Sequence, residues 1–395
     1  MKAIKIITLA VVMCVVFTGC NFRIITDKLP FDNEGESEIG EEITFEGEDF
    51  GSADKNESDG VTIEKPDSQK GEGDRVTSAG QAYSNVTEVY HAVADSVVEI
   101  RTETVQMSLW GQYVASGAGS GVIIDESGII VTNHHVIEDA KTVTVRLTDG
   151  TEYNASLIGY DEAHDIAVIK ITPQSVLTVA PLGCSADLEV GEDIIALGNP
   201  LGTLGGTLTT GIISAKERKI IVGSEKMVLL QTNAAINPGN SGGGLFNMAG
   251  QLVGIVNAKI AEEGIEGIGF AIPIDVAYEV ISDIVEFGYV RGVADDGITT
   301  IDIKNATAAY KYGVAFLGTI IIESKYTDEL KYGDCILSVN GKAIESSEDV
   351  EVVLRSCSVG DVITVTVMRR ENGRNVEKSV NITLRERIPD AVSFN

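Results

Sequence analysis

A serine set between glycines is the residue of this chain best placed for nucleophilic chemistry. It lies in the segment Asn237-Pro238-Gly239-Asn240-Ser241-Gly242-Gly243. A serine hydroxyl is a weak nucleophile unless a base removes its proton and hydrogen-bond donors hold the oxyanion that forms. Because glycines adopt turns that a Cβ would forbid, neighbouring amides can converge on one point here. We expect the N–H groups of Gly239 and Ser241, helped by that of Asn240, to be these donors. The alternative for the segment taken alone is a Gly-rich surface turn.

Two residues upstream could complete a catalytic triad with Ser241. His135 follows an apolar run, 121–124, that reads as a strand, and Asp165 stands at the head of a second apolar run, 166–169. Asp165 would accept a hydrogen bond from the far nitrogen of His135, which fixes the tautomer and stabilises the imidazolium. A strand-end cap is the structural alternative for Asp165. The chain order His, Asp, Ser is that of chymotrypsin-like double barrels, and it differs from the orders of subtilisins and α/β-hydrolases.

The triad candidates lie within a set of segments that resembles the HtrA (DegP/DegQ) family of trypsin-like serine proteases. The resemblance implies a chymotrypsin-like double β-barrel with His135, Asp165 and Ser241 as the triad. It also implies a homotrimer with contacts through residues 83–94, and unfolded or damaged envelope proteins as substrates. The matching segments follow the family's order and cover about half of the chain: Gly119-Ser120-Gly121-Val122-Ile123, Thr132-Asn133-His134-His135-Val136, Asp165-Ile166-Ala167-Val168, Gly198-Asn199-Pro200-Leu201-Gly202, Gln231-Thr232-Asn233-Ala234-Ala235-Ile236 continuing to Gly243, and Gly267-Ile268-Gly269-Phe270-Ala271-Ile272-Pro273.

Two adjacent histidines compete for the role of base. The family's Thr-Asn-x-His-Val pattern assigns the base to His135 and leaves His134 at its variable position. Neighbouring side chains point in different directions, so only one of the two can easily face the serine. Two other positions depart from the family, with Asn233 in place of Asp and Gly244 in place of Pro. Neither belongs to the triad, so we expect altered loop energetics and no loss of chemistry.

The residue six positions before the nucleophile predicts which substrate side chain is accepted. Trypsin-like enzymes that select basic side chains carry an acid there, whereas this chain has Ala235. A buried Arg or Lys of the substrate would lack a counter-charge, which is costly. We therefore expect aliphatic residues such as Val, Ala, Ile or Leu at this position of the substrate. The candidate pocket residues are Ala235, Ile236, Val256, Asn257, Ala258 and Ile268.

Residues 288–390 resemble a PDZ domain. The best match is Tyr332-Gly333-Asp334-Cys335-Ile336-Leu337-Ser338-Val339-Asn340-Gly341-Lys342-Ala343-Ile344, followed by an expected helix at 347–354 and strands at 362–369 and 378–384. PDZ domains add a peptide as a strand and capture its terminal carboxylate with backbone amides. The resemblance implies that this carboxylate loop contains Arg291, Gly292, Gly297 and Ile298.

Two features of this C-terminal domain argue against peptide capture. Asp295 and Asp296 lie in the loop, where they would repel a carboxylate. The family's Ser-Pro-Ala-x-x-Ala-Gly-Leu segment is also replaced, here by residues 324–331. A degenerate PDZ domain used for contacts between subunits is therefore the alternative.

Short strands without intervening helices fill most of the protease domain, residues 81–287. Runs rich in Val, Ile and Thr, separated by Gly, Asp-Gly or Asn-Pro, predict antiparallel barrels with the catalytic residues in the cleft between them. Residues 103–117 are expected to form a loop, and apolar residues at helical spacing predict a helix from 273 to 288. The fold class is therefore dominated by β-structure, a chymotrypsin-like double β-barrel followed by a PDZ-like α+β domain. The expected strands of the protease domain are 95–101, 142–147, 152–160, 166–171, 193–197, 208–215, 228–231, 252–258 and 269–272.

Residues 1–20 have the form of a lipoprotein-type signal peptide. Lys2 and Lys5 precede an apolar core, residues 6–17, that is shorter than the ~20 residues needed to span a bilayer. The segment ends in Phe17-Thr18-Gly19-Cys20, which resembles a bacterial lipobox and implies lipidation of Cys20. An ordinary leader with an incidental cysteine is the alternative. We expect an extracytoplasmic protein of the cell envelope, lipid-anchored to a bacterial membrane.

An acidic segment follows the leader. Residues 21–80 combine many Asp and Glu residues with Ser, Gly and Asn, and they show no helical or strand period. Such a composition buries too little apolar surface to offset the entropy of ordering. We expect a disordered linker that holds the enzyme away from the membrane.

The charge of the chain argues against nucleic acid as a partner, and its cysteines and Gly-rich segments give no sign of a metal or nucleotide site. Its net charge of −29 and pI of about 4.4 leave no basic footprint for nucleic acid. The three cysteines outside the leader, Cys184, Cys335 and Cys357, lack metal-ligand spacing, although the last two could form a disulfide or remain as buried thiols. Residues 117–121 are Gly-rich but lack the Lys-Ser/Thr ending of a phosphate loop. We expect no metal and no cofactor.

Two function classes follow from these residues. The first is a serine endopeptidase that acts on unfolded or partly folded proteins. The second is a chaperone or scaffold that binds exposed chains without cutting them. An intact triad favours the endopeptidase, because a pure binder has no use for that constellation.

Overall fold

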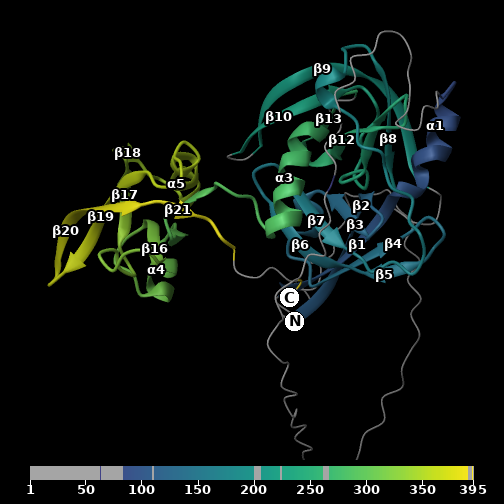
Figure 1. The fold of residues 1–395 in the computed structure, drawn as a ribbon. Coiled ribbons are helices and arrows are strands. Elements are labelled where there is room, and N and C mark those ends of the chain that lie inside the picture. The colour runs from purple at the N-terminus through teal and green to yellow at the C-terminus, as the bar shows by residue number, and fades with distance from the viewer. Residues whose placement is uncertain are drawn as a thin grey trace, which may run out of the picture. The chain divides into compact units, whose positions relative to one another are not determined.

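Figure 1 shows the computed structural model of the chain, which describes residues 83–395 together with Ile63. Within that range it leaves out 109–110, 200–205, 223–224, 261–266, 390–393 and 395. The expected signal peptide at 1–20, the lipidation site Cys20 and nearly all of the 21–80 linker lie outside the described residues.

The first half of the protease domain is a seven-stranded antiparallel sheet in the order β5-β4-β1-β2-β3-β7-β6. Its inward-facing Val and Ile residues form a buried core, as expected for β-branched side chains on a pleated surface. The described strand pairs do not close this sheet into a full barrel. The strands are β1 (Val97–Ser108), β2 (Gly111–Asp125), β3 (Ile129–Thr132), β4 (Thr142–Arg146), β5 (Glu152–Asn154), β6 (Ser156–Asp161) and β7 (Ile166–Lys170).

The second half of the protease domain is a closed barrel in the order β10-β13-β12-β11-β8-β9. Strand β12 is buried along its whole length, which agrees with its apolar sequence up to the terminal Asn257. The predicted class, two β-barrel halves of the chymotrypsin type, is therefore confirmed. The strands are β8 (Asp193–Gly198), β9 (Thr207–Val222), β10 (Glu225–Thr232), β11 (Gly244–Asn247), β12 (Leu252–Asn257) and β13 (Gly269–Pro273).

Three helices accompany the two halves of the protease domain. Helix α1 (Val86–Val93) is capped by the Asn85 side chain, and the short α2 (His134–Ile137) follows β3. Helix α3 (Ile274–Phe287) packs its apolar face against β6, β7 and β12, so it links the two sheets. It ends where Gly288 takes a positive φ of 83°, a conformation that favours glycine.

One residue of the expected linker does not behave as a solvated spacer. The side chain of Ile63 packs against the main hydrophobic core of the protease domain. Its carbonyl oxygen accepts a hydrogen bond of 2.7 Å from the Tyr278 hydroxyl on α3. The prediction of a disordered segment through residue 80 is therefore wrong at this position, because an isolated apolar side chain finds a core to pack on.

The C-terminal domain is built on a six-stranded sheet whose main path is β15-β16-β17-β19-β20. Helix α5 (Ser347–Leu354) packs on this sheet and begins with a capping box between Ser346 and Asp349. Strand β15 lies at the end of the path, and among the described strands it pairs with β16 alone. The remaining elements are β14 (Ala294–Asp295), β15 (Ile298–Ile303), α4 (Ala306–Tyr312), β16 (Gly318–Ser324), β17 (Cys335–Val339), β18 (Lys342–Ala343), β19 (Val362–Glu371), β20 (Arg374–Thr383) and β21 (Arg385–Glu386).

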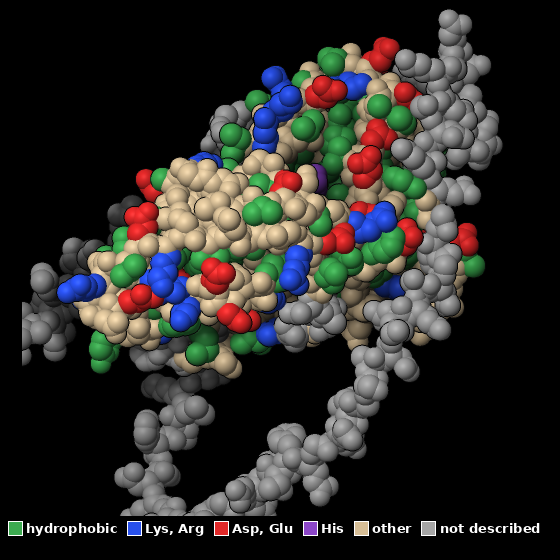
Figure 2. Space-filling view, turned by 60° about the vertical axis from the view of Figure 1, so that its left-hand side comes forward, with side chains coloured by type: hydrophobic (Ala, Val, Ile, Leu, Met, Phe, Trp, Pro, Cys, Tyr) green, Lys and Arg blue, Asp and Glu red, His purple; other side chains and the backbone are tan. Residues whose placement is uncertain are grey.

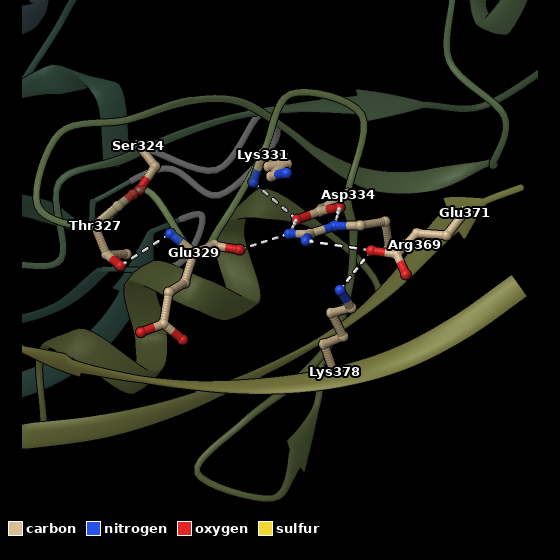
Figure 3. Close-up of polar contacts among 8 residues, drawn as sticks. All are labelled: Ser324, Thr327, Glu329, Lys331, Asp334, Arg369, Glu371 and Lys378. Carbon is tan, nitrogen blue, oxygen red and sulfur yellow. Dashed lines mark hydrogen bonds and ion pairs between the residues drawn. The ribbon is translucent and has the colours of Figure 1, made fainter.

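A buried ion pair holds the segment that departs from the family pattern (Figure 3). Arg369 on β19 donates to both carboxylate oxygens of Asp334, at 2.7 and 2.6 Å, and to the carbonyl oxygen of Glu329 at 2.6 Å. Asp334 in turn accepts the backbone N–H of Lys331. A bidentate pair of this kind fixes geometry as well as charge. It therefore anchors the loop that precedes β17 to strand β19.

Three further observations concern the described residues. Cys184, Cys335 and Cys357 are free thiols, so the disulfide considered for the last two is absent. Within the part of the chain that the structure describes, no helix is both long and apolar enough to span a bilayer. Basic and acidic side chains are interspersed on the face that Figure 2 displays.

Candidate active site

The structure brings His135, Asp165 and Ser241 together. The Nε2 atom of His135 lies 3.0 Å from the Ser241 Oγ, and its Nδ1 atom lies 2.7 Å from the Asp165 Oδ2. The three residues come from different elements: α2, the turn that leads into β7, and the loop between β10 and β11. Ser241 and Asp165 are both buried, at 6% and 7% exposure. A hydroxyl, an imidazole and a carboxylate thus form one continuous hydrogen-bonded chain.

Asp165 is held through both its carboxylate and its backbone carbonyl oxygen. Its Oδ1 accepts the backbone N–H of His135 at 2.9 Å, and its Oδ2 accepts the side-chain amide of Asn257 at 2.8 Å. The Asp165 carbonyl oxygen also accepts from the Asn133 side chain at 3.0 Å. Asp165 itself has a φ of 54°, a region that Asp tolerates better than most residues. The acid is therefore fixed in position before any substrate is present.

Asn257 is a functional residue that sequence reasoning assigned to the wrong role. We expected it to line the substrate pocket, but its side chain turns inward to Asp165 and is only 1% exposed. The neighbouring Val256 is wholly buried in the core of the second barrel, so it cannot line an open pocket either. Both assignments are wrong, because β12 is buried along its length, and the Asn257 side chain is turned towards Asp165. Ala258, which follows the strand, lies next to the Ser241 Oγ.

The structure separates the two adjacent histidines. The ring of His134 stacks on Tyr160, with centroids 4.4 Å apart and an interplanar angle of 18°. His135 instead lies between Asp165 and Ser241. Of the two neighbours, only His135 lies in the hydrogen-bonded chain with the serine.

The loop before Ser241 leaves two backbone donors unused. The N–H groups of Gly239 and Ser241 make no hydrogen bond to any other described residue. Gly239 has a φ of 99°, which a side chain would make costly. The Asn240 N–H, by contrast, donates to the Asn237 carbonyl oxygen at 3.0 Å. We predicted that the Asn240 N–H helps to hold an oxyanion. The structure contradicts this, because that N–H already donates within the turn.

Ser120 is a second functional residue that sequence reasoning did not single out. Its hydroxyl donates to the Gly239 carbonyl oxygen at 2.6 Å and accepts from the Asn199 N–H at 2.8 Å. Its backbone N–H donates to the Ser241 carbonyl oxygen at 2.9 Å. Ser120 on β2 thus ties the serine loop to the first sheet. The flanking Gly119 and Gly121 were the available signal, because they mark a strand that other backbone approaches closely.

The remaining candidate pocket residues lie around the serine loop. Ala235 is exposed, and its carbonyl oxygen accepts from the Thr209 hydroxyl at 3.0 Å. Ile236 is half-buried, and Ile268 is 39% exposed. The N–H of Ala258 lies 3.2 Å from the Ser241 Oγ. Asn233, where the family has Asp, accepts the Ile212 N–H at 2.8 Å and so still holds the strand beside it.

The expected carboxylate loop of the C-terminal domain is only partly assembled. Gly297 has a φ of 67°, and Ile298 follows it at the start of β15. Arg291, however, pairs with Asp283 at 2.8 Å and stacks over Phe287, so its guanidinium is held by α3. The N–H of Gly292 donates to Glu386 at 2.8 Å. Arg291 and Gly292 are therefore engaged outside the loop, contrary to the prediction.

Comparison with known families and relatives agrees with this geometry. The family of trypsin-like peptidase domains matches residues 119–255, and the PDZ domain family matches residues 288–384. The serine protease Do-like HtrA of Lactobacillus helveticus is 37% identical over 293 residues, which cover 69% of this chain and 70% of that protein. The HtrA of Bacillus subtilis is 36% identical over 292 residues and 69% of this chain.

Solved structures of HtrA-type proteases are also similar to this chain. The HtrA-type protease AlgW, solved with a decapeptide, aligns with a TM-score of 0.50 at 31% identity, covering 78% of this chain and 100% of that one. The chain spans 64% of the length of curated relatives such as Protease Do-like 1 of Arabidopsis thaliana and the Bacillus subtilis HtrA. On the peptidase match, the PDZ match and these relatives, the chain belongs to the HtrA family of trypsin-like serine proteases.

Proposed function

We propose that the protein is a serine endopeptidase in which Ser241 is the nucleophile, His135 the general base and Asp165 the residue that orients it. The observation that carries this proposal is the continuous hydrogen-bonded chain from Asp165 through His135 to Ser241, with distances of 2.7 and 3.0 Å. Hydrogen bonds of this length let a proton move from the hydroxyl to the imidazole as the bond to substrate forms.

Each step of peptide hydrolysis can be assigned to residues of this site. Ser241 Oγ attacks the scissile carbonyl carbon while its proton passes to His135 Nε2, and the carbonyl oxygen becomes an oxyanion. The unused N–H groups of Gly239 and Ser241 are the donors for that charge. The intermediate collapses when His135 returns the proton to the leaving amine, which leaves an ester on Ser241. Water, deprotonated by His135, then hydrolyses the ester and restores the serine.

The substrate pocket takes aliphatic side chains. Ala235 stands where an acid would select Arg or Lys, and the exposed Ile268 and half-buried Ile236 supply apolar surface near the serine loop. A cationic side chain placed there would lose its hydration without gaining a partner. The substrates we propose are unfolded or partly folded proteins, whose chains can enter the site in an extended form.

The protein acts outside the cytoplasm, at a bacterial membrane. The form of residues 1–20 and the lipobox-like ending at Cys20 support a lipid anchor, and the acidic segment that follows supports a tether. The name of one relative, the periplasmic serine endoprotease DegP of Escherichia coli, supports a location outside the cytoplasm. We also propose a homotrimer, in keeping with the family resemblance of residues 83–94.

Cleavage of unfolded casein tests the proposal. The purified chain and its Ser241→Ala variant are incubated with casein, and the fragments are identified by mass spectrometry. We expect the chain to cut after Val, Ala, Ile and Leu, and the variant to leave casein intact. Binding of casein without cleavage by the unsubstituted chain would instead support the chaperone class and overturn the proposal.

A further inference from the structure

The C-terminal domain offers a sheet edge beside a helix. Strand β15 pairs with β16 on one side, and its other side has no partner strand among the described residues. Helix α5 contacts β15. An edge strand flanked by a helix is the surface to which PDZ domains add a peptide strand, and the loop before the strand captures the terminal carboxylate. Here that loop runs from Asp295 to Ile298.

An internal carboxylate already occupies a donor of this loop. The Ile298 N–H, the first amide of β15, donates to the Asp296 Oδ1 at 2.9 Å. Asp296 is only 2% exposed. Its other oxygen, Oδ2, is buried and has no hydrogen-bond partner among the described residues. Burying a carboxylate with one unsatisfied oxygen costs folding free energy, so we infer that Asp296 serves a function at this position.

The surroundings of Asp296 are negative on two sides. Asp295 on β14 and Glu351 on α5 both disfavour its ionised form, whereas Arg387 favours it. Arg387 is shared, because it also pairs with Glu351 at 3.2 Å. Burial is the largest effect, and it raises the pKa of Asp296 to about 6 in spite of the Ile298 hydrogen bond.

Tyr326 keeps the loop in this arrangement. Its hydroxyl donates to Asp295 at 2.6 Å, and Arg385 stacks over its ring. A Cβ at Gly297 would lie 2.6 Å from the same ring, so the ring packs directly against the loop backbone. The loop is therefore held closed around Asp296 by a neighbouring side chain rather than left free to rearrange.

We propose that Asp296 is an internal ligand of the carboxylate loop, and that its ionised side chain excludes peptides ending in a free carboxylate from the outer edge of β15 beside α5. Two effects act together. The Asp296 side chain occupies the Ile298 amide, and its charge repels a second carboxylate within a few ångströms. When Asp296 is neutral or absent, the same strand edge accepts a peptide with a C-terminal carboxylate.

A pair of peptides tests this inference. Two fluorescent peptides share one sequence with an apolar last residue, and one ends in a free carboxylate, the other in a carboxamide. Their binding to the full chain, carrying Ser241→Ala to prevent cleavage, is measured by anisotropy. At pH 7.5 we expect no preference for the carboxylate peptide. With Asp296→Ala added, we expect the carboxylate peptide to bind at least about tenfold more tightly than the carboxamide.

Two controls make the result specific. Asp328→Ala removes an exposed acid from the same domain, and it should create no preference. Asp296→Asn keeps the size and an acceptor while removing the charge, so it carries the test if melting curves show that Asp296→Ala is unfolded. For Asp296→Asn we expect a carboxylate preference of at least about threefold.

Peptide binding at pH 5 provides a second, independent test. A peptide carboxylate remains ionised at pH 5, whereas Asp296 is largely protonated there. The unsubstituted loop should therefore gain a preference for the carboxylate peptide at pH 5, and Asp296→Ala should show the same preference at both pH values. The inference is overturned if the unsubstituted loop already prefers the carboxylate peptide at pH 7.5, or if no Asp296 variant creates a preference. These outcomes are independent of whether Ser241 cleaves proteins.

Discussion

The side-chain amide of Asn257 donates to Oδ2 of Asp165 at 2.8 Å, and the same oxygen faces Nδ1 of His135 at 2.7 Å. Asn257 thus sets the direction of the carboxylate that orients the base. A hydrogen bond to a charged group is worth about 1.5–3 kcal/mol. The triad therefore depends on a fourth side chain that comes from the second barrel.

The first prediction concerns Asn257→Ala. Loss of this donor should lower kcat on a peptide substrate by about 10- to 100-fold with little change in KM, because the imidazole is less well oriented as it takes the proton. Asn257→Ser, which retains a hydroxyl donor, should recover part of the loss. Steady-state kinetics with melting curves for both variants provide the measurement. An unchanged kcat in a folded Asn257→Ala protein would show that the contact is structural only.

A second prediction concerns the substrate side chain. Replacing Ala235 by Asp places a carboxylate at the position that selects basic residues, so cleavage after Lys and Arg should rise relative to cleavage after Val. A hydrogen-bonded charge pair that replaces an unpaired charge is worth several kcal/mol, so we expect the ratio to shift by at least about 100-fold. Competition between matched Val and Lys peptides measures it. Ala235→Asn, which has similar size and no charge, is the control and should leave the ratio nearly unchanged.

The buried pair between Arg369 and Asp334 leads to a third prediction. Removing one partner leaves a buried charge unpaired, so Arg369→Met should lower the free energy of unfolding of the C-terminal domain by about 3–5 kcal/mol. Adding Asp334→Ala should cost less than the sum of the two single changes, because the second charge is then removed as well. Hydrogen exchange of the β17 and β19 amides, followed by mass spectrometry, reports on this domain alone. Strictly additive effects would contradict a coupled pair.

The fourth prediction follows from the raised pKa of Asp296. Its value of about 6 in the folded chain exceeds that of the unfolded chain, for which 3.8 is the ordinary value. The folded state therefore binds the extra proton between these values, and the stability of the domain falls as pH rises through this range. The free energy of unfolding lost across this pH range is about 3 kcal/mol.

Asp296→Asn separates this effect from the titration of other groups. The variant cannot ionise, so its domain should be more stable than the unsubstituted one at pH 7.5, and the difference should shrink towards pH 4. Hydrogen exchange of the β15 and β19 amides at both pH values measures it. A difference that stays constant with pH would mean that Asp296 does not carry the shift.

Local sequence rules predicted much of this fold. Helix α3 begins after Pro273 and ends at Gly288, and helix α5 begins at the capping box of Ser346 and Asp349. Helix α3 was predicted from its apolar spacing, which acts within one or two turns, and α5 was predicted from the resemblance of its segment to a PDZ domain. The triad was predictable for another reason, because His, Asp and Ser occur in a fixed order within recognisable segments.

Part of the strand structure was not predicted. Residues 103–117 were expected to form a loop, yet most of them extend the β1–β2 hairpin, where Thr104 pairs with Ala115. The polar and apolar residues of Thr104-Val105-Gln106-Met107-Ser108 alternate, which is a strand signal that the loop prediction overlooked, and pairing with β2 stabilises the hairpin. The short strand β11 was missed, and the expected strand 152–160 is interrupted between β5 and β6.

The direction in which a single side chain points was also not predictable from the sequence. Asn257 lies at the end of a strand that is buried on both faces, so alternation could not tell whether it faces the pocket or the triad. The same holds for Asp296, whose carboxylate folds back onto an amide two residues later. Both orientations are set by tertiary contacts of the finished fold.

The most direct test of the central claim is labelling of Ser241 by a fluorophosphonate, which reacts with an activated serine and needs no knowledge of the substrate. The modified peptide is identified by mass spectrometry in the unsubstituted chain and in His135→Ala. The triad geometry predicts labelling at Ser241 in the first and its loss in the second, because the hydroxyl is a weak nucleophile without its base. Absence of labelling in the unsubstituted chain, or equal labelling in both proteins, would contradict the assignment of Ser241 and His135 as a catalytic pair.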